Sequence, residues 1–220
     1  GSFSVYINPT VELDYTTVPD YAYREMKNNS PYGRIRECND IIEGVTGGTL
    51  LEEQKEELLG QAYFFRAWCY YRLVKIYGGM PIVDFVQTPV LTGEGGWDLS
   101  IPRSSTKECI DFICDDLDKA ATYLPVNWEV SAGTDYGRVT AGTALALQGR
   151  TRLLYASPLF NRGDDEARWE LAYKANEAAM NKLTEGGFGL AYPGNPGRNG
   201  ANWAKVFSDY KSPEAVFVTL

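Results

Sequence analysis

Apolar side chains recur at spacings of three and four residues over most of the chain between positions 31 and 185, which is the period of an amphipathic helix. Pro31 can begin the first helix, and Gly47 and Gly48 end it. A second helix is predicted over Leu51–Tyr77, because two glycines and then Pro81 follow it. The two segments are close enough in the sequence to form a helix pair.

Three further helices are predicted downstream. Ser104 or Ser105 can cap the third, with Glu108 in the position of a capping box. The fourth covers Thr140–Ala156 and is rich in small residues that allow a close helix neighbour, and the fifth covers Asp165–Leu183. At least five helices, paired by loops, indicate a mainly α fold of tetratricopeptide-like helix pairs, although no strict 34-residue consensus is present.

The rest of the sequence has no sustained period. Residues 1–31 are predicted to be an extended N-terminal segment with a short helix near Tyr21–Lys27. Residues 32–185 form the helical repeat core, with long loops between helices. Residues 186–220 are predicted to be a loop and then a strand from Pro213 onward, the minor β part of the fold, leading into a C-terminal part outside this sequence.

The segment Ala62–Pro81, "AYFFRAWCYYRLVKIYGGMP", mixes seven aromatic side chains with three cations. Such a mixture suits a ligand surface, but it also suits a deeply enclosed helix. On a helix, Gln61, Arg72 and Lys75 fall within an arc of roughly 80°, and most of the remaining circumference is apolar. A core helix is therefore the favoured interpretation, and Arg66, which lies among the rings, needs a partner.

Composition excludes several classes of function. A net charge of -8 is unsuited to nucleic acid, which needs clustered cations. The chain has no histidine, so it cannot build a Ser-His-Asp site, and its four cysteines form no C-x-x-C pair. We expect no metal site and no cofactor, and buried free thiols are favoured over a disulfide. No apolar run is long enough to span a membrane.

Two acidic clusters could in principle supply the carboxylate pair of a glycosidase. Asp115, Asp116 and Asp118 lie on one predicted helix and are interpreted as a solvated face. The cluster from Asp164 to Glu166 begins the next helix and is interpreted as a cap that matches the helix dipole. The chain is therefore predicted not to be an enzyme.

The segment "QAYFFRAWCYYRLVKIYGGMPIV" resembles the hallmark of the SusD/RagB family, glycan-binding lipoproteins of Bacteroidetes outer membranes. The positions that match the hallmark in order are Ala62, Phe64, Arg66, Ala67, Tyr70, Leu73, Gly78 and Pro81. The segments "YGRIRECNDII" and "GRVTAGTALALQGRTRLLYASPLFN" resemble other helices of that family. The resemblance runs from about Tyr32 to Leu220.

This resemblance implies a SusD-like fold and a function in binding oligosaccharide or polysaccharide without catalysis. It implies a second partner, a SusC-like TonB-dependent transporter to which the sugar is delivered. It also implies a place on the outer membrane at the cell surface, held by a lipid anchor. The lipidated cysteine and the C-terminal half that the family has are absent from this sequence, so part of the ligand surface is expected outside it.

Sugar recognition requires exposed rings for the apolar faces of pyranoses and polar groups for the hydroxyls. Loop aromatics with polar neighbours are therefore the candidates, and a further loop with Trp203 ranks below them. The predicted glycan-binding residues are Tyr21, Tyr23, Trp97, Asp98, Trp128 and Tyr136. Each ring has an alternative role as a lid folded over the core. The alternative function is a helical-repeat scaffold that binds protein rather than sugar.

Overall fold

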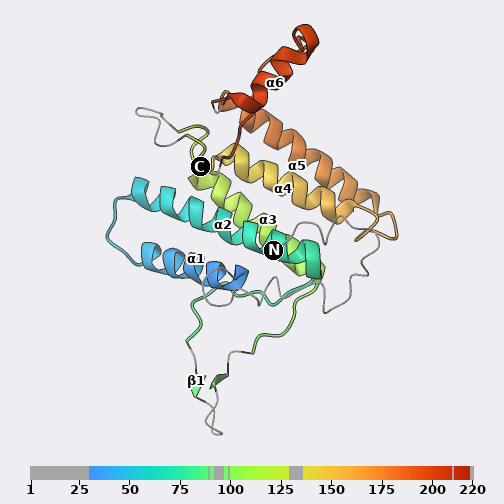
Figure 1. Cartoon of the computed structure of the whole chain (residues 1–220). Coiled ribbons are helices and arrows are strands. Elements are labelled where there is room, and N and C mark those ends of the chain that lie inside the picture. Colours follow the sequence, from blue (N-terminus) through green and yellow to red (C-terminus); the bar gives the residue numbers. More distant parts are fainter. Residues whose placement is uncertain are drawn as a thin grey trace.

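The computed structural model describes residues 30–88, 90–91, 97–98, 100–128, 136–209 and 211–218. Within these residues the fold is mainly α, as predicted. Its long helices are α1 (Pro31–Thr46), α2 (Glu52–Tyr77), α3 (Thr106–Tyr123), α4 (Ala141–Ala156) and α5 (Glu166–Glu185). Figure 1 shows these helices side by side in chain order, and each packs mainly against its neighbours in the sequence. No helix in the described ranges is both long and apolar enough to cross a membrane.

The helix boundaries follow the predicted start and stop signals. The Ser30 hydroxyl accepts the Gly33 N–H at 3.0 Å, and Pro31 is the first residue of α1. Ser105, rather than Ser104, caps α3, and its reciprocal bonds with Glu108 complete the predicted capping box. The Asp165 side chain caps α5, as predicted for that acidic cluster.

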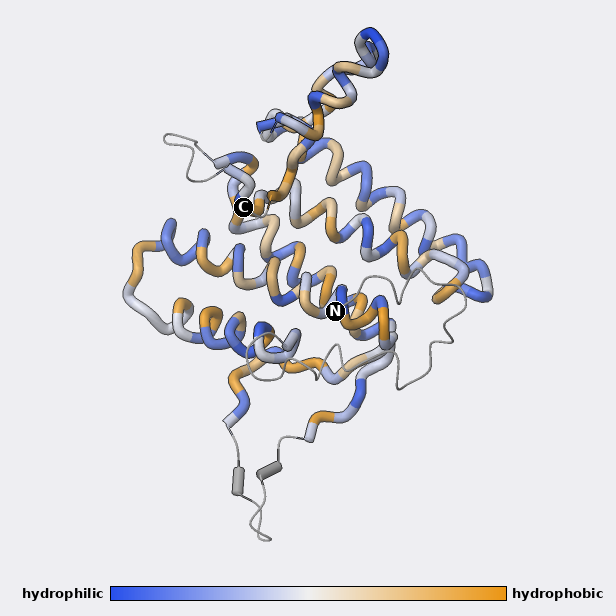
Figure 2. Tube along the Cα trace, viewed as in Figure 1, coloured by the Kyte–Doolittle hydropathy of each residue, from blue (hydrophilic) through white to orange (hydrophobic). Residues whose placement is uncertain are grey.

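The aromatic segment of α2 is the centre of the core, so the core interpretation is confirmed. Phe64, Tyr70 and Leu73 are fully buried against residues of α1, α3 and α4. Figure 2 shows hydrophobic and hydrophilic residues interleaved along the long helices, so each has apolar positions to offer its neighbours. The four cysteines are free thiols, and burial raises the pKa of Cys38 and Cys114 to about 12.

One acidic residue departs from its predicted environment. Asp116 of α3 is fully buried, whereas the sequence placed it on a solvated face. Its carboxylate accepts two hydrogen bonds from Arg66 of α2, at 2.7 and 2.8 Å. Burial raises the pKa of Asp116, and the hydrogen bonds and charge of Arg66 act in the opposite direction. The pair supplies the partner that Arg66 required.

Small residues set the closeness of α4 and α5. A Cβ atom added at Gly142 would lie 2.6 Å from Leu183, and one added at Gly149 would lie 2.6 Å from Asn176. The Asn176 amide donates to the Gly149 carbonyl at 3.2 Å, across the same contact. The predicted role of small residues in α4 is therefore confirmed.

The chain between α2 and α3 makes a long excursion with a small hairpin. The backbone N–H of Val83 donates to the Tyr70 hydroxyl at 2.7 Å, which holds the outgoing segment on α2. Farther out, β1 (Val90–Leu91) pairs antiparallel with β2 (Trp97–Asp98). Figure 1 shows this hairpin projecting from the row of helices.

The C-terminal part differs from its prediction in two ways. A short 3₁₀ turn at Arg198–Gly200 and helix α6 (Ala201–Ser208) lie where a loop was predicted. Residues 213–218 form turns and bends rather than the predicted strand. These residues return to the helices: the Val218 N–H donates to the Gly137 carbonyl at 3.2 Å, and the Phe217 ring contacts the Phe64 ring edge to face.

Candidate functional site

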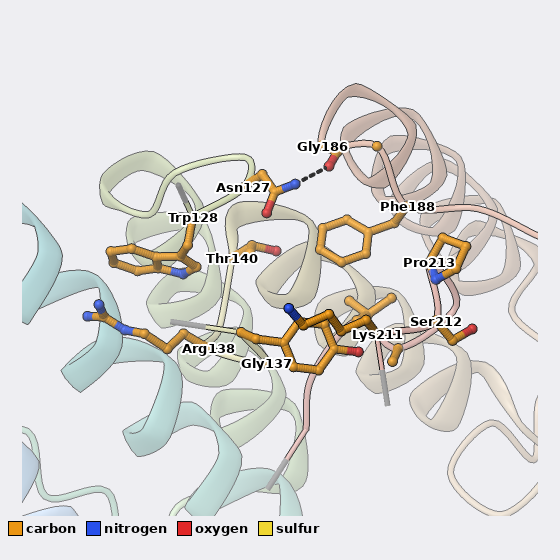
Figure 3. Close-up of a pocket in the computed structure, with 14 residues that line it drawn as sticks. Asn127, Trp128, Gly137, Arg138, Thr140, Gly186, Phe188, Lys211, Ser212 and Pro213 are labelled. Carbon is orange, nitrogen blue, oxygen red and sulfur yellow. Dashed lines mark hydrogen bonds between the residues drawn. The ribbon is translucent and has the colours of Figure 1, made fainter. Parts of the chain in front are cut away.

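A cavity of about 390 Å³ lies where three stretches of the chain meet (Figure 3). The first is the connection from α3 to α4, the second is the turn after α5, and the third is the returning segment 211–216. The residues that line it are Asn127, Trp128, Tyr136, Gly137, Arg138, Thr140, Gly186, Gly187, Phe188, Lys211, Ser212, Pro213, Ala215 and Val216.

Hydrogen bonds between backbone segments hold these walls in place. The Asn127 amide donates to the Gly186 carbonyl at 2.7 Å, which ties the α3–α4 connection to the end of α5, as the dashed line in Figure 3 shows. The Thr143 hydroxyl donates to the Val216 carbonyl at 3.2 Å, and the Gly189 N–H donates to the Pro213 carbonyl at 3.1 Å. The cavity is thus built on the ends of α4 and α5.

Trp128 has a fixed orientation at the edge of the cavity. Its indole N–H donates to the Val139 carbonyl at 2.8 Å, and the Arg138 guanidinium carbon lies 3.6 Å from the ring centroid. The ring is half-buried and packs against the core. The ring therefore makes the core contact of the lid interpretation and also forms part of the cavity wall, while its role in glycan binding stays a prediction.

The lining joins rings to polar groups. Trp128, Tyr136 and Phe188 supply aromatic surface, whereas Asn127 and Ser212 supply an amide and a hydroxyl. This mixture suits a ligand that has both apolar faces and hydroxyl groups, as a pyranose does. In the part of the chain that the structure describes, no group of three or more His, Cys, Asp or Glu residues could hold a metal ion.

Comparison with known proteins assigns the chain to a family. A family model of the SusD-like type, described as "Starch-binding associating with outer membrane", matches residues 4–153. The chain belongs to the SusD-like family. This confirms the resemblance seen in α2, and members of the family bind carbohydrate and are not catalysts, in line with the non-enzyme prediction.

Solved structures of SusD-like proteins share the fold. A SusD-like protein from Bacteroides fragilis is 30% identical, with a TM-score of 0.65, and the match covers 85% of this chain and 31% of that one. A SusD-like carbohydrate binding protein from the same species is 26% identical, with a TM-score of 0.54, covering 69% of this chain and 26% of that one. This SusD-like chain therefore spans less than a third of the length of either. No curated protein matches it.

The predicted site residues fall into three groups on this SusD-like chain. Trp128 and Tyr136 are brought together at the cavity. Trp97 and Asp98 form β2, in the hairpin that Figure 1 shows well away from the ends of α4 and α5. Tyr21 and Tyr23 lie outside the described residues. The structure therefore unites two of the six candidates, and the role of all six in binding stays a prediction.

Sequence reasoning missed several lining residues. Phe188 and Lys211 stand in a stretch that was predicted to be plain loop, and Ser212 precedes the predicted strand. The glycine pair Gly186-Gly187, which ends α5, was the one sequence signal of a sharp turn there. The lower-ranked Trp203 lies on α6 instead of a loop, exposed and against Phe207, with ring centroids 4.9 Å apart.

Proposed function

We propose that this protein binds an oligosaccharide or polysaccharide at the cell surface and passes it, uncleaved, to a SusC-like TonB-dependent transporter in the outer membrane. The observation that carries the proposal is membership of a family described as starch-binding and associated with the outer membrane. A relative that is 26% identical is itself described as a carbohydrate binding protein. The transporter and the lipid anchor are proposed from the resemblance of α2 to the family hallmark.

The cavity supports this proposal as one part of the sugar-binding surface. Its rings and polar groups match the two kinds of surface that a pyranose presents. No carboxylate is present among the 14 residues drawn around it in Figure 3, so this lining does not supply the carboxylate pair of a glycosidase. Trp97, Asp98, Tyr21 and Tyr23 are proposed to add binding surface elsewhere.

Replacing Trp128 tests the cavity as a sugar site. We expect Trp128→Ala to weaken binding of the preferred glycan at least about tenfold, since a ring that stacks on a sugar contributes on the order of 1.4 kcal/mol or more. Trp128→Phe keeps a ring but loses the hydrogen bond to Val139, so it should bind better than the alanine variant. Affinity electrophoresis against a panel of plant, host and microbial polysaccharides measures both.

Trp203→Ala is the matched control, because Trp203 is exposed on α6 and does not line the cavity. It should bind like the parent protein. If Trp128→Ala lowers the melting temperature and leaves retardation in the gel unchanged, Trp128 is a lid on the core and the cavity is not the sugar site.

A second function, protein binding by the helical array, is favoured by the outer face of α5. Trp169, Tyr173 and Met180 follow one another at spacings of four and seven residues, which places them on one side of the helix. Tyr173 is 66% exposed and Met180 69% exposed, so the stripe lies at the surface of the part described. An exposed apolar stripe on a helix is typical of a protein contact.

The double variant Tyr173→Glu with Met180→Glu separates the two functions. We expect it to leave glycan retardation unchanged and to lower the yield of the complex with the SusC-like transporter in detergent, because charges on the stripe oppose its burial. If the double variant yields as much complex as the parent protein, α5 is not part of the transporter contact. Loss of glycan binding instead would assign the stripe to the sugar site.

A further inference from the structure

The side-chain amide of Asn127 has its donor engaged and its acceptor open. Its Nδ2 donates to the Gly186 carbonyl at 2.7 Å, which fixes which end of the amide is nitrogen and which is oxygen. Among the described residues, none donates a hydrogen bond to Asn127 Oδ1. Figure 3 shows this oxygen directed away from Gly186, between the Trp128 and Phe188 rings. Because Asn127 is exposed and lines the cavity, its oxygen is an acceptor that a ligand can reach.

An apolar wall of the cavity lies beside this acceptor. Its members are the side chains of Phe188, Pro213, Ala215 and Val216. Three of them are half-buried, and the proline is exposed. The amide and the wall meet at Gly186: Asn127 Nδ2 binds its carbonyl, and atoms of the Phe188 ring lie 3.2 Å from a Cβ atom built there. Within the described part of the chain no other ring stacks on Phe188, so its surface is open to a ligand.

Phe188 is held in place through the backbone rather than through its ring. Its own N–H donates to the Leu183 carbonyl at 2.9 Å, at the end of α5. The next N–H along the chain, that of Gly189, donates to the Pro213 carbonyl at 3.1 Å. The ring is therefore presented to the cavity by a fixed turn, and a shorter side chain at this position leaves both bonds in place.

From this juxtaposition we propose that the cavity binds the acetamido group of an N-acetylated sugar. The inference rests on the proposed function, because it takes the ligand to be a saccharide, and it deepens that function by naming the class of saccharide. An acetamido group carries an N–H donor and a methyl group on one planar unit, so it requires an acceptor beside an apolar surface. Asn127 Oδ1 accepts the N–H, and the methyl group packs on Phe188 and Val216.

A hydroxyl group in the same position uses only half of this arrangement. It can donate to Asn127 Oδ1, but it brings no methyl group to the apolar wall. The acetyl carbonyl lies at the rim, where Asn127 is exposed and water supplies a donor. The preference for acetamido over hydroxyl therefore comes mainly from the apolar surface that the methyl group covers.

The test uses pairs of sugars that differ in the acetamido group alone. Fully N-acetylated chitotriose is compared with cellotriose by calorimetry with the 220-residue chain. The methyl glycoside of N-acetylgalactosamine is compared with that of galactose by ligand-observed NMR titration. We expect at least one acetamido member to bind about fivefold or more tightly than its hydroxyl counterpart, the effect of burying roughly one methyl group. The first pair reports a gluco-configured ligand and the second a galacto-configured one.

Phe188→Ala should reduce this preference to no more than about twofold, because the ring is the largest part of the apolar wall. Phe188→Leu keeps an apolar side chain and should keep most of the preference. Phe207→Ala is the matched control, since Phe207 is 74% exposed on α6 and does not line the cavity, and it should leave both affinities unchanged. Equal weakening of both members of a pair by Phe188→Ala would show that the ring does not contact the acetyl group, and would overturn the assignment.

Two further outcomes separate this inference from the function on which it rests. Equal binding of the two members of each pair, or tighter binding of the hydroxyl member, overturns the acetamido class. If a polysaccharide of the plant, host and microbial panel still retards the protein in that case, glycan binding itself stands. If none of the four sugars binds and no polysaccharide retards the protein, the proposed function is overturned as well.

Discussion

Arg66→Leu is expected to lower the free energy of unfolding by about 3–5 kcal/mol, the range measured when one partner of a buried ion pair is removed. Arg66 is 3% exposed, and its guanidinium forms two parallel hydrogen bonds to the Asp116 carboxylate, which is 0% exposed. Leucine leaves that carboxylate buried without its main partner, since Lys119 approaches it only to 3.9 Å. Urea unfolding followed by circular dichroism gives the change.

The cost is high because Arg66 also organises the segment after α2. Its Nη1 donates to the Asn39 side-chain oxygen at 2.7 Å, and the Asn39 amide donates to the carbonyls of Val83 and Phe85 at 3.0 Å each. One guanidinium thus connects α1, α2, α3 and the outgoing segment. A partly satisfied buried network of this kind is less favourable than an apolar core.

Two variants make the expected result specific to the buried pair. Lys174→Ala removes an exposed bond to Glu170 of 2.6 Å and should change stability by no more than about 0.5 kcal/mol. The double variant Arg66→Leu with Asp116→Leu should recover much of the loss, because it removes the stranded charge as well. A single variant as stable as the parent protein, or a double variant no better than the single, would contradict the stranded-charge explanation.

Arg66 also shows how much of a buried environment can be predicted from the sequence. Helical geometry placed the cation among rings and required a partner, and both points are confirmed: the guanidinium carbon lies 5.3 Å from the Tyr63 ring centroid and 5.1 Å from that of Phe112. The identity of the partner could not be predicted, because Asp116 is 50 residues away. Asp116 stands beside acidic neighbours, and local pattern alone assigns such a run to solvent.

The prediction of a C-terminal strand is wrong for a related reason. β-branched and aromatic residues at Val216, Phe217 and Val218 have high strand propensity, but a strand forms only where a neighbour accepts its backbone hydrogen bonds. The structure gives this segment single bonds instead, from Thr143 to Val216 and from Val218 to Gly137. Its residues act by packing onto the helices rather than by pairing.

The candidate cavity was half predictable. Trp128 and Tyr136 were found because aromatic residues with polar neighbours in a loop are a local signal. Phe188 reaches that loop through the turn after α5, and Lys211 reaches it through the return of the chain after α6, and neither approach is encoded by a periodicity. Local patterns therefore identified the five long helices and one wall of the cavity, whereas α6 and the other walls were not predicted.

Gly79→Ala is expected to destabilise the protein by about 3 kcal/mol, at the upper end of the usual cost of overpacking. A Cβ atom at Gly79 would overlap the Ser104 carbonyl oxygen and lie 3.0 Å from the Thr106 backbone nitrogen. Backbone atoms cannot rotate out of the way as a side chain does. The two ends of the α2–α3 connection meet here, with the Ser104 N–H donating to the Met80 carbonyl at 3.2 Å. A methyl group that pushes these ends apart would therefore also displace the start of α3.

The same junction is held by Arg103, whose Nε donates to the Gly79 carbonyl at 2.5 Å and whose Nη2 donates to the Tyr77 carbonyl at the end of α2. Gly44→Ala is the control with the opposite expected sign: beyond the adjoining residues and the backbone of α1, no atom lies within 4 Å of a Cβ built at this helical position, and alanine should stabilise α1 by about 0.5–1 kcal/mol. Urea unfolding compares the two. Equal changes in both variants would show that helix propensity and chain entropy dominate, and that the meeting of residues 79 and 104 tolerates a methyl group.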